Sequence, residues 1–122
     1  FGVINIACPD MVAHTGKIEP TIAAIKAADQ AIGELLDLCK NTSSDLLITG
    51  DHGNAEELLL ANQDVDTKHS NFPVPLILYT NESKSFKLEK GVLGDIAPTI
   101  LKLLNIPKPD SMTGQSLIVN QT

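Results

Sequence analysis

The segment that most constrains this chain runs from Leu46 to Asn54, where a short apolar run ends and a polar turn begins. Residues 46–49 have strand-like character, and Asp51 and His52 follow directly, with a glycine on each side. Glycine adopts backbone angles that other residues avoid, so the Asp–His pair can lie on a tight turn. In open α/β sheets, functional groups gather beyond the carboxyl ends of the strands. Carboxylate oxygen and neutral imidazole both suit zinc, manganese or cobalt, so this turn predicts part of a metal site.

The rest of the chain alternates strand-like runs with segments of helical spacing, which predicts an α/β fold with a mostly parallel sheet flanked by helices. The expected strands span residues 1–7, 45–49 and 73–79, with shorter ones near Phe86 and at 117–119. The expected helices span residues 18–40, 56–61 and 95–104, the last with Asp95 as its N-cap. Residues 1–122 are expected to form one domain or part of one. Because the first strand-like run begins at residue 1, we expect the chain to be cut from a longer protein.

Composition excludes several classes of partner. The net charge of −6 argues against nucleic acid and against anionic membranes. Every basic residue is lysine, so the planar arginine clamps that usually hold phosphate are missing, and a small anionic substrate would need metal ions or another part of a larger protein. No signal peptide or bilayer-length apolar run is visible. Cys8 and Cys39 lie on apolar segments and are expected to be buried thiols in a reducing compartment, which predicts a cytoplasmic protein.

Three histidines and two aspartates form the candidate set of metal ligands: Asp10, His14, Asp51, His52 and His69. A single histidine in a loop is more often a hydrogen-bonded loop residue than a ligand. All three histidines, however, lie in polar loops next to expected strands. Asp10 and His14 are four residues apart, so even one helical turn would bring them to the same side. Ser70 adjoins His69, but adjacency in sequence does not make a catalytic pair, and we do not expect a serine nucleophile there.

Longer strings carry a family resemblance. Residues 9–16 read Pro-Asp-Met-Val-Ala-His-Thr-Gly, and residues 49–56 read Thr-Gly-Asp-His-Gly-Asn-Ala-Glu. Asp-Ile-Ala-Pro-Thr follows at 95–99 and Met-Thr-Gly-Gln-Ser-Leu at 112–117. In this order they resemble the C-terminal portion of cofactor-independent (2,3-bisphosphoglycerate-independent) phosphoglycerate mutase, of the alkaline phosphatase superfamily. The family usually has glycine where Ala13 stands and alanine where Gly50 stands, and neither departure removes a ligand. Phosphopentomutase shares the Asp-His-Gly-Asn turn but lacks the first string, so it ranks second.

The resemblance implies an alkaline-phosphatase-like core, here partial, with two divalent metal ions, most commonly Mn²⁺. It implies that Asp10, His14 and His69 hold one metal ion. It implies that Asp51 and His52 contribute to the other.

The same resemblance implies that the parent enzyme interconverts 2-phosphoglycerate and 3-phosphoglycerate in glycolysis through a phosphoserine intermediate. Its nucleophilic serine and inserted phosphate-handling domain are expected upstream of Phe1, so no catalytic nucleophile is expected within residues 1–122. The chain alone is therefore expected to be inactive. A free-standing metal-binding module derived from such an enzyme is the alternative from a different functional class.

Overall fold

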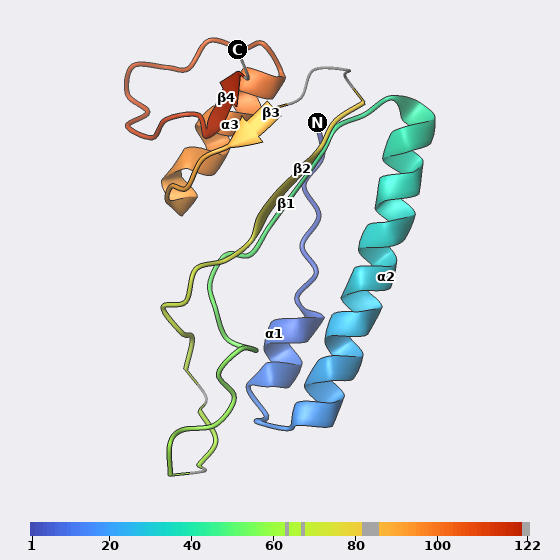
Figure 1. The fold of residues 1–122 in the computed structure, drawn as a ribbon, viewed down its shortest axis with the longest axis vertical. Coiled ribbons are helices and arrows are strands. Elements are labelled where there is room, and N and C mark those ends of the chain that lie inside the picture. The colour runs from blue at the N-terminus through green and yellow to red at the C-terminus, as the bar shows by residue number, and fades with distance from the viewer. Residues whose placement is uncertain (63, 67, 82–85, 121–122) are drawn as a thin grey trace. The chain divides into compact units, whose positions relative to one another are not determined.

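The computed structural model describes residues 1–62, 64–66, 68–81 and 86–120, which fall into two compact units (Figure 1). The first unit, Phe1–Thr80, contains α1 (Cys8–Ala13), α2 (Ile18–Thr42), β1 (Leu46–Thr49) and β2 (Leu76–Tyr79). The second, Asn81–Thr122, contains β3 (Phe86–Leu88), the 3₁₀ turn η1 (Leu93–Asp95), α3 (Ile96–Leu103) and β4 (Ile118–Asn120). Among the described residues, no helix combines the length and the apolar character that crossing a bilayer would require.

The predicted mostly parallel sheet is wrong, because each unit has a two-stranded antiparallel sheet. β1 pairs with β2, with Leu46 opposite Tyr79, and β3 pairs with β4 in the same antiparallel sense. A parallel pair requires a crossover connection, which is usually a helix. The helix expected at 56–61 is not formed, and the described residues between β1 and β2 are turns, bridges and loops. The chain therefore reverses direction between β1 and β2 and returns antiparallel.

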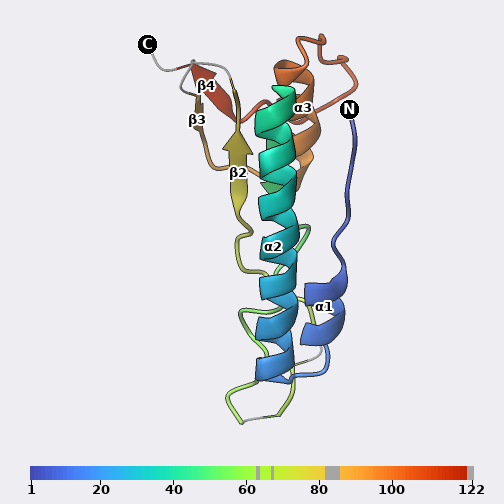
Figure 2. The same ribbon diagram turned by 90° about the vertical axis from the view of Figure 1, so that its right-hand side faces the viewer.

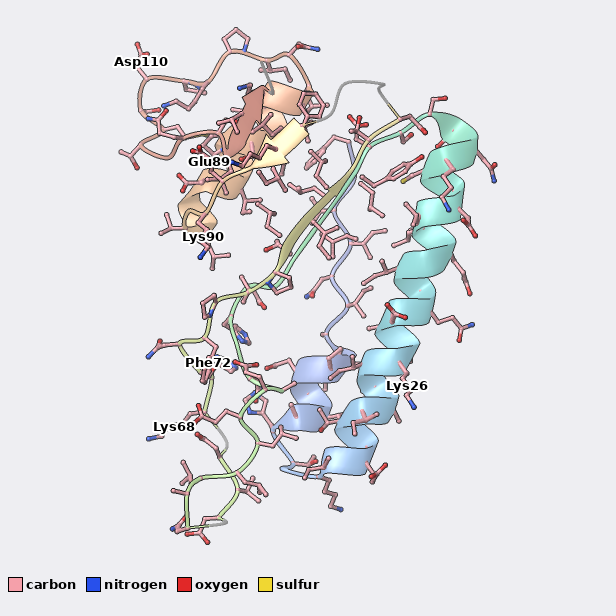
Figure 3. All side chains as sticks on the ribbon, viewed as in Figure 1. Lys26, Lys68, Phe72, Glu89, Lys90 and Asp110 are labelled. Carbon is pink, nitrogen blue, oxygen red and sulfur yellow. The ribbon has the colours of Figure 1, made fainter. Side chains whose placement is uncertain are left out.

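The strand expected at 1–7 is also wrong. These residues lead into α1 as an irregular segment without a strand partner in the described part of the chain (Figure 2). Phe1, Val3 and Ile4 have exposed fractions of 86%, 82% and 65%, so the run is not buried. Farther along, Phe72 is 54% exposed on the loop that leads into β2 (Figure 3). Apolar composition alone does not make a strand, because the backbone groups also need a ladder partner.

Helix α1 begins at Cys8, where a strand end was expected. Pro9 lies in its first turn, where backbone N–H groups have no partner within the helix, so the N–H that proline lacks is not needed. Cys8 is consequently exposed and Cys39 is only half-buried, so the expectation of two buried thiols is wrong.

The long helix predicted at 18–40 is confirmed as α2, which ends two residues later than expected. Ser43 adopts a left-handed φ of 52° and donates its N–H to the carbonyl of Cys39, which ends the helix. α2 packs against α1 and β1, and Thr21 and Ala28 are its buried residues (Figure 1). The predicted apolar stripe is only partly covered, since Ile22 remains 40% exposed.

In the second unit, the predicted C-terminal helix is confirmed as α3, and the short strands near Phe86 and at the tail as β3 and β4. Asp95 holds the N-cap position, but its carboxylate accepts the N–H groups of Val92 at 2.9 Å and Gln115 at 2.8 Å. The fully buried Thr99 hydroxyl donates to the carbonyl of Asp95 at 2.7 Å and accepts the N–H of Leu117 at 3.0 Å. These bonds fasten the tail to the start of α3. Residues 82–85 of the predicted polar loop lie outside the described part of the chain.

Candidate metal centre

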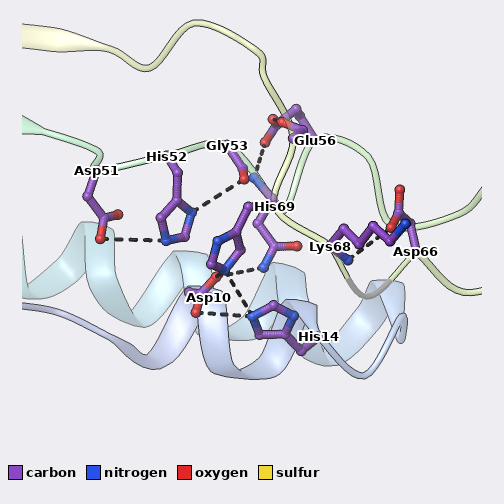
Figure 4. A network of polar contacts seen from close by, with 11 residues as sticks. Asp10, His14, Asp51, His52, Gly53, Glu56, Asp66, Lys68 and His69 are labelled. Atoms are coloured by element: carbon purple, nitrogen blue, oxygen red, sulfur yellow. Dashed lines mark hydrogen bonds and ion pairs between the residues drawn. The ribbon is translucent and has the colours of Figure 1, made fainter. Parts of the chain in front are cut away.

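The sequence-predicted ligands come from three segments of the first unit (Figure 4). Helix α1 carries Asp10, and His14 is the C-cap residue that directly follows the helix. Asp51 and His52 follow β1, and His69 lies on the loop that leads into β2. The two loops meet in an antiparallel bridge directly beyond His52 and His69, so the fold brings together histidines 17 positions apart in the chain.

The carboxylate of Asp10 lies between two imidazole rings. His14 Nε2 is 3.4 Å from Asp10 Oδ2, and His69 Nε2 is 3.4 Å from Asp10 Oδ1. The two Nε2 atoms are themselves 3.3 Å apart. A hydrogen bond between them requires one ring nitrogen to donate and the other to accept through its lone pair, and the tautomers decide which is which. The structure thus brings Asp10, His14 and His69 to one point with their donor atoms facing each other.

His52 joins the same cluster from the other loop. Its ring stacks on that of His69, with centroids 3.5 Å apart and planes inclined by 14°. A carboxylate oxygen of Asp10 and one ring nitrogen each of His52 and His69 all lie within 4.8 Å of one another. Asp51 is the outlier, because its side chain is 87% exposed and its nearest cluster contact is with His52, where Oδ2 lies 3.6 Å from Nε2. His52 therefore adjoins both of the ligand sets that the family resemblance separates.

Asn54 donates a hydrogen bond to the carboxylate of Asp10. Its side-chain Nδ2 donates to Asp10 Oδ1 at 2.6 Å, and this bond is the main reason that the pKa of Asp10 lies below its ordinary value of 3.8. Burial opposes the shift, and the three neighbouring histidines add to it. Asn54 is only 5% exposed, and its Oδ1 is buried with no hydrogen-bond partner in the described structure. The site thus combines an ionised carboxylate, imidazole nitrogens and an amide oxygen that has no hydrogen-bond partner among the described residues.

Sequence reasoning gave no role to Asn54 or Glu56. Glu56 accepts the Ser70 hydroxyl and the N–H of Asn54, the latter at 2.9 Å, and its pKa is lowered chiefly by the Ser70 bond. The only signal in the sequence is that both residues belong to the same string, 49–56, as two of the ligands. Ser70, weighed as a nucleophile from its position beside His69, is instead a hydrogen-bond donor to Glu56.

The donor set fits a divalent cation. Imidazole nitrogen together with carboxylate oxygen is the ligand chemistry of zinc, manganese and cobalt sites. The bond from Asn54 to Asp10 is the kind of outer contact that orients metal-binding carboxylates. The residues placed closely enough to hold a divalent cation are Asp10, His14, His52 and His69, with Asp51 at the exposed edge.

Comparison with known proteins agrees with this chemistry. The model of the metalloenzyme superfamily matches residues 1–108. The 2,3-bisphosphoglycerate-independent phosphoglycerate mutases of Staphylococcus aureus (strain Mu50) and Staphylococcus haemolyticus are each 46% identical over 116 residues, which is 95% of this chain and 23% of theirs. A crystal structure of Leishmania mexicana phosphoglycerate mutase at low cobalt concentration matches 97% of this chain and 24% of that chain, with a TM-score of 0.83 and 25% identity. The chain thus spans only about a quarter of the length of the proteins it matches. It belongs to the metalloenzyme superfamily, and it is homologous to one segment of the 2,3-bisphosphoglycerate-independent phosphoglycerate mutases.

Proposed function

We propose that this chain supplies the metal-binding part of the active site of a cytoplasmic phosphoglycerate mutase that interconverts 2- and 3-phosphoglycerate. The observation that carries the proposal is the convergence of donor atoms from Asp10, His14 and His69, at 3.3 to 3.4 Å from one another. The 46% identity to the staphylococcal mutases supports the substrate class. The nucleophilic serine and the groups that grip phosphoglycerate are proposed to belong to the remainder of such an enzyme.

The proposed division of ligands assigns Asp10, His14 and His69 to one Mn²⁺ and Asp51 and His52 to a second. Bound divalent cations would lower the pKa of an attacking hydroxyl and neutralise charge on a phosphoryl group. Helix α1 fixes the side chains of Asp10 and His14 on one side of a single turn. Imidazole nitrogens bind such an ion through a free lone pair, so each ligating nitrogen must be unprotonated.

The metal assignment predicts two unequal binding events. Three protein ligands complete a usable site with water, whereas a single carboxylate and imidazole compete poorly with solvent. Titration calorimetry or manganese EPR should therefore show about one tightly bound Mn²⁺ per chain and a second, weak one. His14→Ala and His69→Ala should abolish the tight event, and His52→Ala should leave it largely intact. Asp37→Ala, which removes an exposed carboxylate paired with Lys40 on α2, is the control.

Loss of the tight event with His52→Ala alone would show that the ligands are divided wrongly. It would favour the alternative grouping of Asp10, His52 and His69, whose ligand atoms lie within 4.8 Å of one another. Two equally tight sites would contradict the division as well.

The proposal also predicts that the 122-residue chain alone does not convert 3-phosphoglycerate to 2-phosphoglycerate. Its metal ligands cannot by themselves provide a phosphoserine intermediate, and the chain contains no arginine to grip the substrate. An enolase-coupled assay in the presence of Mn²⁺ tests this, with the full-length Staphylococcus aureus mutase as the positive control. Metal-dependent turnover by the chain, after contaminating mutase has been removed, would contradict the prediction.

A further inference from the structure

The carboxylate of Glu56 joins the two loops that carry His52 and His69. One of its oxygens accepts the hydroxyl of Ser70, and the other accepts the N–H of Asn54 at 2.9 Å (Figure 4). The backbone of the same loops is linked by the bond from Ser70 N to Gly53 O at 2.8 Å. Glu56 therefore adds a side-chain connection across the bridge that holds the loops together.

Gly53 leaves the space in which this connection forms. A β-carbon at Gly53 would overlap both the Glu56 carboxylate and the Ser70 hydroxyl. Gly53 itself is buried, and so is the next residue, Asn54. The contact among these side chains is thus built on a glycine, because any larger residue would push Glu56 and Ser70 apart.

The connection lies directly beside the histidines. His52 precedes Gly53 in the chain, and His69 precedes Ser70, so the separation of the two loops determines how the two rings meet. Those rings stack with centroids 3.5 Å apart. We propose that Glu56 is a positioning residue, whose carboxylate ties the His69 loop to the His52 loop through Ser70 and so keeps the His69 ring where metal binding requires it. This inference rests on the proposed metal-binding function.

Two substitutions separate positioning from simple charge. The Ser70 hydroxyl lowers the pKa of Glu56, so Glu56 is an anion at neutral pH and could favour a cation merely by its charge. Glu56→Gln removes the charge but keeps the connection, since its oxygen can accept the Asn54 N–H and its amide can donate to the Ser70 oxygen. Glu56→Ala removes both. If Glu56 acts by positioning, Glu56→Ala should lose much of the Mn²⁺ affinity and Glu56→Gln only a little. If it acts by its charge, the two variants should lose equal affinity.

The test measures Mn²⁺ affinity by titration calorimetry on variants of the 122-residue chain. Outer residues that orient metal ligands typically contribute 10- to 100-fold in affinity, and the exposure of Glu56 favours the lower end of that range. Glu56→Ala and Ser70→Ala should each raise the Kd roughly tenfold, and Glu56→Gln by less than about threefold. The double variant Glu56→Ala/Ser70→Ala should lose no more Mn²⁺ affinity than the weaker-binding single variant, because both substitutions break the same contact. Glu57→Ala, the exposed neighbouring glutamate, should bind as the wild type does.

A second readout does not depend on metal. Stacked rings shift each other's proton signals, so NMR of the metal-free chain should show the His52 and His69 ring signals moving in Glu56→Ala and Ser70→Ala but not in Glu57→Ala. Wild-type affinity together with unmoved ring signals in both variants would overturn the inference, and so would equal losses for Glu56→Ala and Glu56→Gln. Should Glu56→Ala fail to fold by circular dichroism, Ser70→Ala decides, because it removes only a hydroxyl. If the proposed function itself is wrong, the wild-type chain will bind no Mn²⁺. The ring signals of the metal-free chain still test the Glu56–Ser70 contact in that case.

Discussion

At the scale of single residues, Asp10 is the side chain around which the cluster is arranged. Two imidazoles lie 3.4 Å from its oxygens, and Asn54 Nδ2 donates to Oδ1 at 2.6 Å. A hydrogen bond to a charged group contributes about 1.5–3 kcal/mol when the groups are shielded from water, and less where they are partly exposed, as Asp10 is. The Asn54 bond therefore serves mainly to fix the direction in which Asp10 presents its lone pairs.

Removing that bond should weaken metal binding. We expect Asn54→Ala to raise the Kd for Mn²⁺ roughly tenfold, because Asp10 loses the partner that orients it. Asn62→Ala is the matched control, since Asn62 Nδ2 makes the same kind of bond to Asp64 Oδ2 at 2.7 Å on an exposed loop. Titration calorimetry on both variants gives the comparison. Equal affinities would show that Asp10 keeps its orientation without Asn54.

The residues of the cluster could be predicted from the sequence, but most of their contacts could not. Asp10 and His14 are four residues apart, and local helical geometry is enough to bring them together. Asn54 meets Asp10 across 44 positions, and Ser70 meets Glu56 across 14. Such contacts depend on how loops are folded back, which no local pattern encodes.

At the scale of elements, the helices could be predicted from local sequence patterns, whereas the sheets depend on contacts between distant segments. The period of apolar residues is a local signal, and it located α2 and α3 to within two residues at each end. Strand direction depends on which run pairs with which, and the run at 1–7 has no ladder partner in the described residues. The expected parallel sheet was inferred from the alternation of elements alone, and the antiparallel pairing of β1 with β2, with no helix in the described residues between them, overturns it.

Thr99 allows a direct test of how the tail is fastened to α3. Valine has nearly the same shape but lacks the hydroxyl that accepts the Leu117 N–H at 3.0 Å in a buried setting. Thr99→Val should lower the free energy of unfolding by about 1–3 kcal/mol, the cost of an unpaired buried donor. Thr42→Val, at the exposed end of α2, should cost much less, because water can replace its bond to Leu38. Urea unfolding and hydrogen exchange of the Leu117 amide measure the effect.

The hydrogen bonds to the Asp95 carboxylate predict that the stability of the protein depends on pH. The N–H groups of Val92 and Gln115 bind its ionised carboxylate and hold its pKa below the ordinary value of 3.8. A group whose pKa is depressed on folding stabilises the protein above its unfolded pKa, and this contribution is lost as the pH falls through the folded pKa. Asp95→Asn should therefore lower the Tm at neutral pH, and the difference from wild type should shrink as the pH falls below about 3.8. A difference that stays constant into strong acid would contradict this, and Asp110→Asn, on an exposed turn, serves as the control.

At the scale of the whole molecule, all five candidate ligands belong to the first unit, Phe1–Thr80. Among the described residues of that unit few are buried, and these include Ala13, Thr21 and Ala28. Large apolar side chains remain on its surface, and exposed apolar patches on soluble proteins commonly mark surfaces that other chains or segments cover. The candidate metal ligands thus form a small, well-connected cluster on a unit whose described residues bury little core.

This exposure predicts that the 122-residue chain associates with itself. Val3 and Ile4 are 82% and 65% exposed on a segment whose backbone makes no strand pairing in the described residues, so it can pair with or pack against a second copy. Val3→Lys should reduce the association, because a lysine that meets an apolar surface must give up its hydration. Asn5→Lys adds the same charge to the same segment without removing an apolar side chain, and it should change the association much less. Light scattering over a range of concentrations measures both variants against the wild type. A wild-type chain that remains monomeric at the highest concentration would contradict the prediction, and an equal effect of the two lysines would assign the association to charge rather than to the apolar segment.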